Sequence, residues 1–219
     1  MAQQTINVGA APNDGTGDPA RTAFTKCNAN FIELYTADTT FLTAATSGNR
    51  VLIQSQTVGS AVATVDFTTG IDSTFDQYEI AVYNYRPATN NSALSIRVSQ
   101  DAGGTWKAGA SDYQSGYFTM ATTSSIATRT RIELQNMDAA NAATSSGNAI
   151  IRFAVPATAG VHKSFYGMMG YPESVTPTQQ MIIFAGSYRG NTNAINGVRF
   201  LASSGNIATG TFALYGIVI

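Results

Sequence analysis

Apolar residues recur with two different periods along the chain, and the change of period divides it. From residue 19 to 47 they follow alternating spacings of four and three, which mark one face of a helix. The residues of this seam are Ala20, Phe24, Cys27, Phe31, Leu34 and Phe41. The polar Asp38 interrupts the seam once. We therefore expect a short helix over 19–47 that carries the apolar stripe of a coiled coil.

After residue 48 the period falls to two, which is typical of strands with one buried face. In the run 94–98, Leu94, Ile96 and Val98 alternate with Ser95 and Arg97. Similar runs lie at 51–54, 61–67, 78–85, 117–120, 130–134, 149–153, 165–169, 180–184, 197–201 and 211–217. Turn-forming residues separate most of them, and no helical pattern intervenes. Residues 48–219 are therefore predicted to form an antiparallel β-sandwich, jelly-roll-like in its pattern.

The first 18 residues have little apolar content and are rich in residues that break regular structure. Pro12, Gly15, Gly17 and Pro19 punctuate this segment, so neither a helix nor a strand is expected there. Asp18 is expected to cap the following helix, with Pro19 in its first position. The predicted protein is mainly β: an extended segment at 1–18, a helix at 19–47 and a sandwich at 48–219.

The predicted helix needs a partner, because helices of this length take most of their stability from packing. An identical chain is the simplest partner for the seam, which predicts a homo-oligomer. Phe24 and Phe31 at the a positions do not select between a dimer and a trimer. Cys27 is the single cysteine, so an intrachain disulfide is excluded, and we expect a small buried apolar side chain.

Charge is sparse and scattered. Asp, Glu, Lys and Arg make up 11% of the 219 residues and the net charge is −1, whereas soluble domains average about 25% charged residues. The twelve basic residues are dispersed, so the clustered footprint of a nucleic-acid-binding protein is missing from the sequence. No apolar run approaches the ~20 residues of a transmembrane helix, and the N-terminus does not resemble a signal peptide. We expect no nucleic-acid partner, no membrane insertion and synthesis in a cytoplasm.

The stretch from Ile6 to Tyr35, INVGAAPNDGTGDPARTAFTKCNANFIELY, resembles the N-terminal segment of tailed-bacteriophage fibre, tailspike and appendage proteins. Residues 75–80, 93–106 and 204–217 are similar to β-rich phage structural domains. The resemblance implies a virion structural protein without cofactors, a homotrimer attached to a capsid, collar or tail protein. The implied anchoring residues are Ile6, Val8, Pro12, Asn13, Asp14, Gly15, Gly17 and Asp18. Location on the head or on the tail is left open.

Residues able to support catalysis are few. The stretch 99–106 matches an Asp-box, but a single copy indicates a structural hairpin held by Asp101 and Trp106 rather than a glycosidase propeller. His162 is the only histidine, so a metal site or a catalytic triad would have to include it. Carboxylate pairs such as Asp112 with Asp101 or with Glu133 are not distinguished by the sequence. The glycines at 15–20 fit a dinucleotide fingerprint without its preceding strand. We expect no metal site and no enzyme activity.

Tyrosines are numerous and suit the binding of sugars, because an exposed ring can stack on a sugar face. Tyr113 and Tyr117, in the stretch 109–117, are the candidate pair for binding a host-surface glycan. Most tyrosines in strands instead bury the ring and keep the hydroxyl wet. Two alternative functions follow: a receptor-binding tail-fibre lectin, and a small polysaccharide depolymerase.

Overall fold

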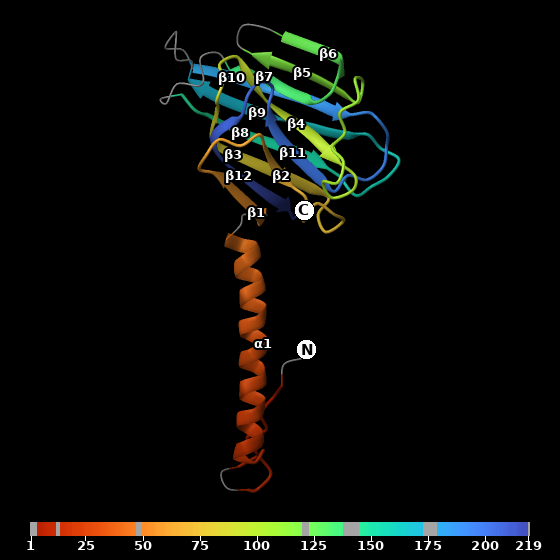
Figure 1. Cartoon of the computed structure of the whole chain (residues 1–219). Helices are drawn as coiled ribbons and strands as arrows, with labels where there is room; N and C mark the ends of the chain where they lie inside the picture. Colours follow the sequence, from red (N-terminus) through yellow and green to blue (C-terminus); the bar gives the residue numbers. More distant parts are fainter. Residues whose placement is uncertain are drawn as a thin grey trace. The chain divides into compact units, whose positions relative to one another are not determined.

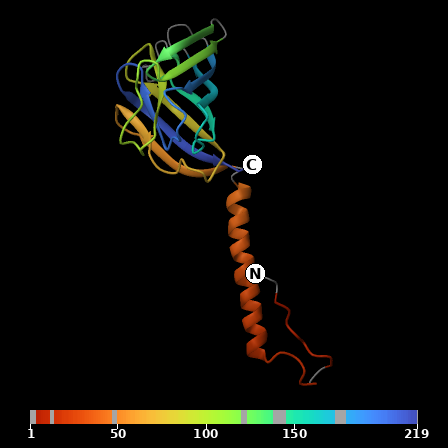
Figure 2. The ribbon, with the colours of Figure 1, turned by 90° about the vertical axis from the view of Figure 1, so that its right-hand side faces the viewer.

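The computed structural model describes residues 4–11, 14–46, 50–119, 123–137, 145–172 and 179–218. The chain divides into two compact units, Met1–Asn49 and Arg50–Ile219. In the first unit the expected helix is present as α1, Ala20–Thr46 (Figure 1). All strands of the described residues belong to the second unit, which makes the protein mainly β (Figure 1 and Figure 2).

The second unit is a β-sandwich of two antiparallel sheets. Its strands are β1 (Arg50–Val58), β2 (Thr64–Phe67), β3 (Gln77–Pro87), β4 (Ser92–Ser99), β5 (Tyr113–Thr119), β6 (Thr123–Arg129), β7 (Ile132–Met137), β8 (Gly147–Ala154), β9 (Lys163–Pro172), β10 (Gln179–Tyr188), β11 (Gly197–Ala202) and β12 (Ile207–Ile217). The large sheet has the order β1-β12-β3-β8-β9-β10-β5-β6, and the small sheet has the order β2-β11-β4-β7.

Strands far apart in the sequence pair with each other. β1 pairs with β12, β2 with β11, β3 with β8 and β4 with β7, so the chain doubles back on itself from both ends. Two further antiparallel pairs, β5 with β6 and β9 with β10, extend the large sheet beyond β8. The sequence pattern does not predict β6, because its residues TSSIATR include few apolar side chains and form an edge strand.

The core lies between the two sheets, and aromatic rings form part of it. In β8 the burial alternates strictly, so that Ile151 and Phe153 point inward while their neighbours face solvent. The ring of Phe153 stacks on Tyr78 with 5.4 Å between centroids and on Phe165 with 4.9 Å. In the small sheet, the rings of Phe200 and Phe67 pack edge to face and belong to the same core. Burial of such rings accounts for much of the favourable free energy of folding.

The turn expected at 99–106 is confirmed. Oδ1 of Asp101 accepts hydrogen bonds from the N–H of Thr105 at 2.7 Å and from the Ser99 hydroxyl at 2.6 Å. These donors lower the pKa of Asp101 to about 2, with the Ser99 hydroxyl contributing most. Gly103 has φ of +90°, which an L side chain adopts at a cost. Asp101 therefore acts as a structural residue of this hairpin.

Candidate functional site

Asp14 organises the N-terminal loop, defined as residues 4–18. Its Oδ2 accepts hydrogen bonds from the N–H groups of Ala10 and Ala11, both at 2.7 Å, and its Oδ1 accepts one from the N–H of Thr16 at 2.9 Å. These backbone donors, that of Thr16 first, lower the pKa of Asp14 to about 2. Gly9, with φ of +81°, lies directly against the Asp14 carboxylate. The carboxylate thus holds a tight turn.

Asn7 closes the base of the N-terminal loop against Asp18. The N–H of Asn7 donates to Asp18 Oδ2 at 2.9 Å, and the N–H of Asp18 donates to the Asn7 carbonyl at 2.7 Å. The Asn7 side chain also donates to the carbonyl of Thr16 at 2.8 Å. The expected capping of α1 by Asp18 is wrong, because among the described residues its carboxylate binds Asn7 and Lys26 instead of a helix amide.

The loop is tied to one side of α1. The Lys26 ammonium binds the Thr5 carbonyl at 3.0 Å and the Asp18 carboxylate at 2.7 Å, which lowers the pKa of Asp18. One turn further, Asn30 exchanges two hydrogen bonds with the backbone of Gln4, at 2.9 and 2.8 Å. The prediction of an extended segment at 1–18 is therefore corrected: the described part folds back on the helix through polar contacts.

The other anchoring residues differ in their surroundings. Ile6 and Val8 are exposed apolar side chains on the loop. Gly15 has φ of +74° and open space where a Cβ would be. A Cβ at Gly17 would come within 3.1 Å of the Asn7 carbonyl oxygen, so this glycine permits the close approach of two backbone segments. Pro12 and Asn13 lie outside the described residues.

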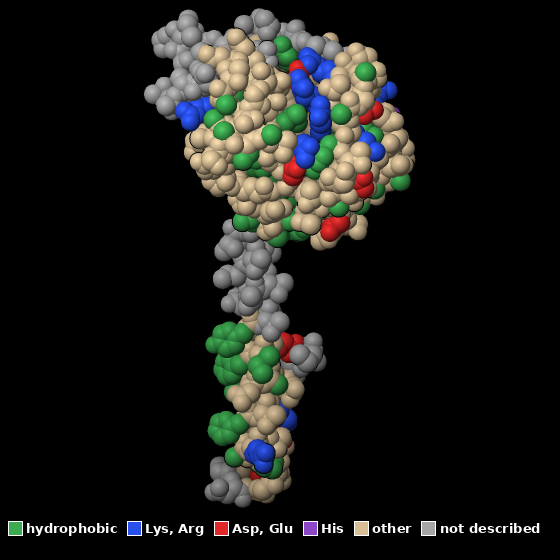
Figure 3. Space-filling model, viewed as in Figure 1, with side chains coloured by type: hydrophobic (Ala, Val, Ile, Leu, Met, Phe, Trp, Pro, Cys, Tyr) green, Lys and Arg blue, Asp and Glu red, His purple; other side chains and the backbone are tan. Residues whose placement is uncertain are grey.

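The seam of α1 presents large apolar side chains to solvent. Phe24, Phe31 and Leu34 are 70%, 51% and 61% exposed, whereas Cys27 and Ala20 are half-buried and exposed, respectively. Figure 3 shows hydrophobic side chains along one side of the helix. Lys26 and Asn30, which hold the loop, lie one turn apart on another face. The side chain of Phe41 lies outside the described side chains.

A ladder of exposed apolar residues crosses the outer face of the large sheet. Ile150 of β8 pairs with Met168 of β9, Met168 pairs with Ile183 of β10, and Ile183 pairs with Phe118 of β5. All four side chains are exposed by about half of their surface. Contiguous apolar surface of this kind typically marks a site of protein contact.

The four residues of this ladder also line a groove of about 940 Å³. In the next row, Arg152 pairs with Tyr166, Tyr166 with Ala185, and Ala185 with Gly116, so two small residues leave space beside the tyrosine ring. The Tyr166 ring is 46% exposed, and its hydroxyl accepts a hydrogen bond from the Gln77 amide at 3.2 Å. This surface therefore combines an exposed aromatic ring with a shallow, mainly apolar floor.

The two tyrosines proposed from the sequence are placed differently. Tyr113 is 0% exposed; its hydroxyl accepts from the N–H of Val98 and donates to the carbonyl of Lys107, both at 3.0 Å. Burial raises its pKa. A buried ring cannot stack on a sugar, so the assignment of Tyr113 to glycan binding is corrected. Tyr117 is half-buried against the core and contributes to the lining of the groove.

A cluster of arginines, here called the arginine cluster, lies on the outer face of the small sheet and extends to the neighbouring edge strand β6 of the large sheet. It consists of Arg97 of β4, Arg129 of β6, Arg131 just before β7 and Arg199 of β11. Figure 3 shows a stripe of basic side chains on this part of the molecule. Arg199 binds the Asp66 carboxylate through Nε at 2.8 Å and Nη2 at 2.6 Å, and its guanidinium lies 4.3 Å from the ring centre of Trp106.

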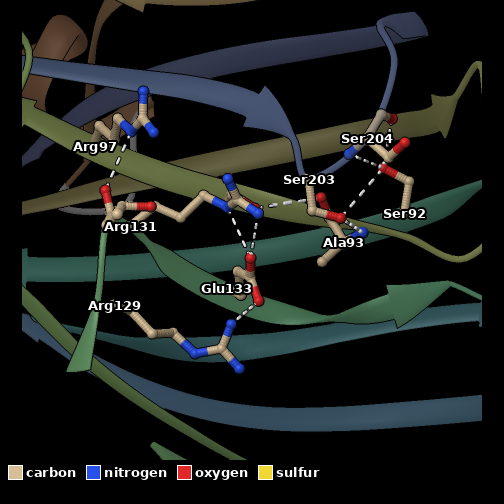
Figure 4. Close-up of polar contacts among 10 residues, drawn as sticks. Ser92, Ala93, Arg97, Arg129, Arg131, Glu133, Ser203 and Ser204 are labelled. Carbon is tan, nitrogen blue, oxygen red and sulfur yellow. Dashed lines mark hydrogen bonds and ion pairs between the residues drawn. The ribbon is translucent and has the colours of Figure 1, made fainter. Parts of the chain in front are cut away.

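Glu133 holds two other members of the arginine cluster. It accepts a hydrogen bond from Nε of Arg131 at 2.7 Å and forms an ion pair with Arg129 (Figure 4). Arg97 donates from Nε to the Thr130 carbonyl at 3.2 Å. Among the described residues no carboxylate pairs with Arg97. The cluster therefore contains one guanidinium without an acidic partner.

Serine contacts beside the arginine cluster join β4 to the turn that follows β11. Ser92 donates to the Ser204 carbonyl at 2.8 Å and accepts from the Ser204 N–H at 3.0 Å, while Ser203 accepts from the N–H of Ala93 at 2.8 Å (Figure 4). Ser92 is buried. These bonds satisfy backbone groups at the end of the sheet, which is a structural role.

The catalytic candidates lie in different loops and strands of the sandwich. His162 is exposed in the loop before β9. Asp112 accepts from the N–H of Gly109 at 2.7 Å, and Asp101 and Glu133 hold the hairpin and the arginine cluster described above. No group of three potential metal ligands occurs among the described residues. In the same part of the chain, no helix is both long and apolar enough to cross a membrane.

Sequence reasoning missed both exposed surfaces of the sandwich. The apolar ladder has a sequence signal, since the runs Ile150-Ile151, Met168-Met169 and Ile182-Ile183 are apolar on both faces of a strand. The arginine cluster has none, because its members come from three strands and the turn before β7 and form no basic run in the sequence. Comparison of the chain with protein family models, with curated proteins and with solved structures found no match.

Proposed function

We propose that this chain is a non-enzymatic subunit of a homotrimeric fibre on a tailed-phage virion. In this proposal the N-terminal loop docks on a capsid, collar or tail protein, α1 trimerises as a coiled coil, and the β-sandwich is displayed. The virion location and the trimeric state in this proposal rest on the resemblance of residues 6–35 to the anchoring segments of phage fibre proteins. The observation that carries the proposal is the exposed seam of α1.

The seam supports association because three of its side chains are large, apolar and at least half exposed. Burying a Phe or Leu side chain contributes about 1.5–3 kcal/mol, so Phe24, Phe31 and Leu34 would together stabilise each helix by several kcal/mol. The loop is bound to α1 through Lys26 and Asn30, which lie off the seam. Association and docking can therefore take place on the same helix without competing for one face.

The N-terminal loop supports an attachment role because its conformation is held before docking. Asp14, Asn7 and Asp18 satisfy the turn amides, and Ile6 and Val8 present apolar surface. A preformed loop loses less conformational entropy on binding than a disordered segment does. Three copies joined through α1 would also bind with the avidity of linked sites.

We further propose that the sandwich is a jelly roll. The pairing of β1 with β12, β2 with β11, β3 with β8 and β4 with β7 supports this topology, with β5–β6 and β9–β10 as additions. Jelly rolls are common in viral capsid proteins and lectins. In the fibre, the apolar ladder of the large sheet would contact another copy of the chain, which is the partner that the α1 seam already requires.

The oligomer is tested by replacing two seam residues. Phe24→Asp/Phe31→Asp is expected to give a folded monomer in light scattering, because two carboxylates cannot be buried in the seam without partners. The matched control is Thr22→Asp/Thr25→Asp, which adds the same charges to exposed positions off the seam and is expected to stay trimeric. A trimer in both variants would place the main interface in the sandwich and refute the coiled coil.

Attachment is tested separately on virions. Deletion of residues 2–18 is expected to leave the trimer intact and to remove the protein from purified particles. The point variant Asp14→Ala removes the acceptor of three loop amides and is also expected to lower the amount of the protein on purified particles. Normal amounts of the truncated protein on particles would refute the anchor.

A further inference from the structure

The arginine cluster carries a local excess of positive charge. Four guanidiniums, those of Arg97, Arg129, Arg131 and Arg199, face two carboxylates, those of Asp66 and Glu133. The difference of four and two leaves two positive charges. The whole chain has a net charge of −1, so this excess of positive charge is local.

Arg97 stands at the centre of this excess. It pairs in register with Arg199 across β4 and β11, and Arg131 precedes Ile132, which pairs with Ile96. Burial and the charges of Arg131 and Arg199 lower the pKa of Arg97. Like charges opposite each other on neighbouring strands destabilise a sheet. Repulsion among these arginines therefore destabilises the free protein, and a bound anion would offset that repulsion.

The neighbours of Arg97 are fixed in position while Arg97 keeps free donors. Arg199 is held by the Asp66 carboxylate and the Trp106 ring, and Arg131 is held by Glu133. Figure 4 shows a bond from Arg97 at Nε only, to the backbone of Thr130. In the part of the chain that the structure describes, no bond is found to either terminal nitrogen of this guanidinium, so both can donate to a ligand. A guanidinium with both terminal nitrogens free can donate two parallel hydrogen bonds to the two oxygens of a carboxylate or phosphate.

We propose that the outer face of the small sheet binds a carboxylate or phosphate group of an acidic polysaccharide, with Arg97 as the central ligand between Arg131 and Arg199. In the adjoining row of the sheet, Thr64, Leu201, Ser95 and Glu133, the serine is buried, and two of the three side chains that reach solvent, Thr64 and Glu133, are polar. Such a row suits a hydroxyl-rich ligand better than the apolar side chains of a peptide.

The carboxylates that lie among the arginines favour an acidic polysaccharide over a nucleic acid as the ligand. Asp66 and Glu133 lie among the arginines and would repel a continuous phosphate backbone, whereas anions spaced along a saccharide can avoid them. The inference goes beyond the proposed attachment to a virion and does not depend on it, because the site lies entirely within the second unit.

The test is calorimetric titration of the full-length chain with polygalacturonate, with neutral dextran and with inorganic phosphate, all at constant ionic strength. We expect polygalacturonate to bind and dextran not to bind. Arg97→Gln should weaken binding about tenfold or more, the effect of losing one charge-assisted bidentate contact. The matched control is Arg189→Gln, which removes the same charge from an exposed residue that binds Gln114 outside the cluster.

A second variant tests the opposite direction. Asp66→Asn removes a carboxylate that competes for Arg199, so it should bind polygalacturonate more tightly. Without ligand, Arg97→Gln should melt at the same or a higher temperature, because a like-charge repulsion is removed. The rise in melting temperature that polygalacturonate gives the unchanged protein should disappear in Arg97→Gln.

Four outcomes would overturn the proposal. These are the absence of any binding, equal binding of dextran, equal losses in Arg97→Gln and Arg189→Gln, and binding of free phosphate as tight as that of the polysaccharide. The last result would leave an isolated anion site without a saccharide. Because Arg97→Gln leaves the N-terminal loop and α1 unchanged, its effect on binding is independent of trimer formation and of attachment to particles.

Discussion

Nε of Arg152 donates a 2.8 Å hydrogen bond to Oε2 of Glu79, across the paired strands β8 and β3. Glu79 is buried, and Nη2 of Arg50 lies 2.7 Å from its other oxygen. The Glu79 carboxylate raises the pKa of Arg152 through this hydrogen bond. Both arginines reach solvent, whereas Glu79 does not. The loss of stability on removing the carboxylate should therefore differ from the loss on removing the two arginines.

Removing the carboxylate should cost less than removing its partners. Glu79→Gln leaves two arginines that water can hydrate, and we expect a loss of about 1–2 kcal/mol in the free energy of unfolding. Arg50→Gln/Arg152→Gln leaves a buried carboxylate without a cation, and we expect a loss of about 3 kcal/mol or more. Urea denaturation measures both values. A larger loss in Glu79→Gln would contradict this asymmetry.

The N-terminal loop should open in acid. The pKa of Asp14 is lowered from 3.8 to about 2, so its contribution to the folded loop is fully present above pH 4. As the pH falls from 3.8 to 2, protonation removes the acceptor of the Ala10 and Ala11 amides and the contribution is lost.

Hydrogen exchange at the Ala10 and Ala11 amides, corrected for the pH dependence of intrinsic exchange, should report this opening. The variant Asp14→Asn should lose protection of the same amides already at neutral pH. Protection that stays constant down to pH 2 would show that the loop is held by other contacts.

Two glycines of β9 should respond differently to the same substitution. A Cβ at Gly167 would overlap the Ile150 carbonyl oxygen, so Gly167→Ala must separate β8 from β9, at a cost of about 2–3 kcal/mol. Gly170 has no atom closer than 3.6 Å, and Gly170→Ala should change stability by less than about 1 kcal/mol. Thermal unfolding of the two variants decides; equal destabilisation would argue against this local packing.

Two fully buried tyrosines allow a comparison of how much a hydroxyl group contributes to stability with and without hydrogen-bond partners. Tyr113→Phe leaves the N–H of Val98 and the carbonyl of Lys107 without a partner, so we expect a loss of about 1–3 kcal/mol. The hydroxyl of Tyr85 has no hydrogen-bond partner among the described residues, and Tyr85→Phe should be neutral or stabilising. Comparable losses in both variants would contradict the assigned bonding.

The sequence by itself determined the type of each main element. A period of 3.6 or of two depends on residues close together in the chain, so α1 and most strands could be predicted from local spacing. The Asp101 turn was predictable for the same reason, because the donors and the acceptor lie within seven residues. The N-terminal loop was not, since its contacts join Gln4 to Asn30 and Asn7 to Asp18.

Only the tertiary structure decided which residues share a surface. In β5, Tyr113 and Tyr117 alternate with Gly116 and Phe118, so apolar groups lie on both faces and the spacing does not say which face is the core. Packing of the two sheets buried Tyr113 and left Phe118 exposed. Arg97 and Arg199 are about a hundred residues apart and meet through the register of β4 with β11. Register is fixed by pairing and by core burial across the whole sandwich, and that is information a local pattern does not contain.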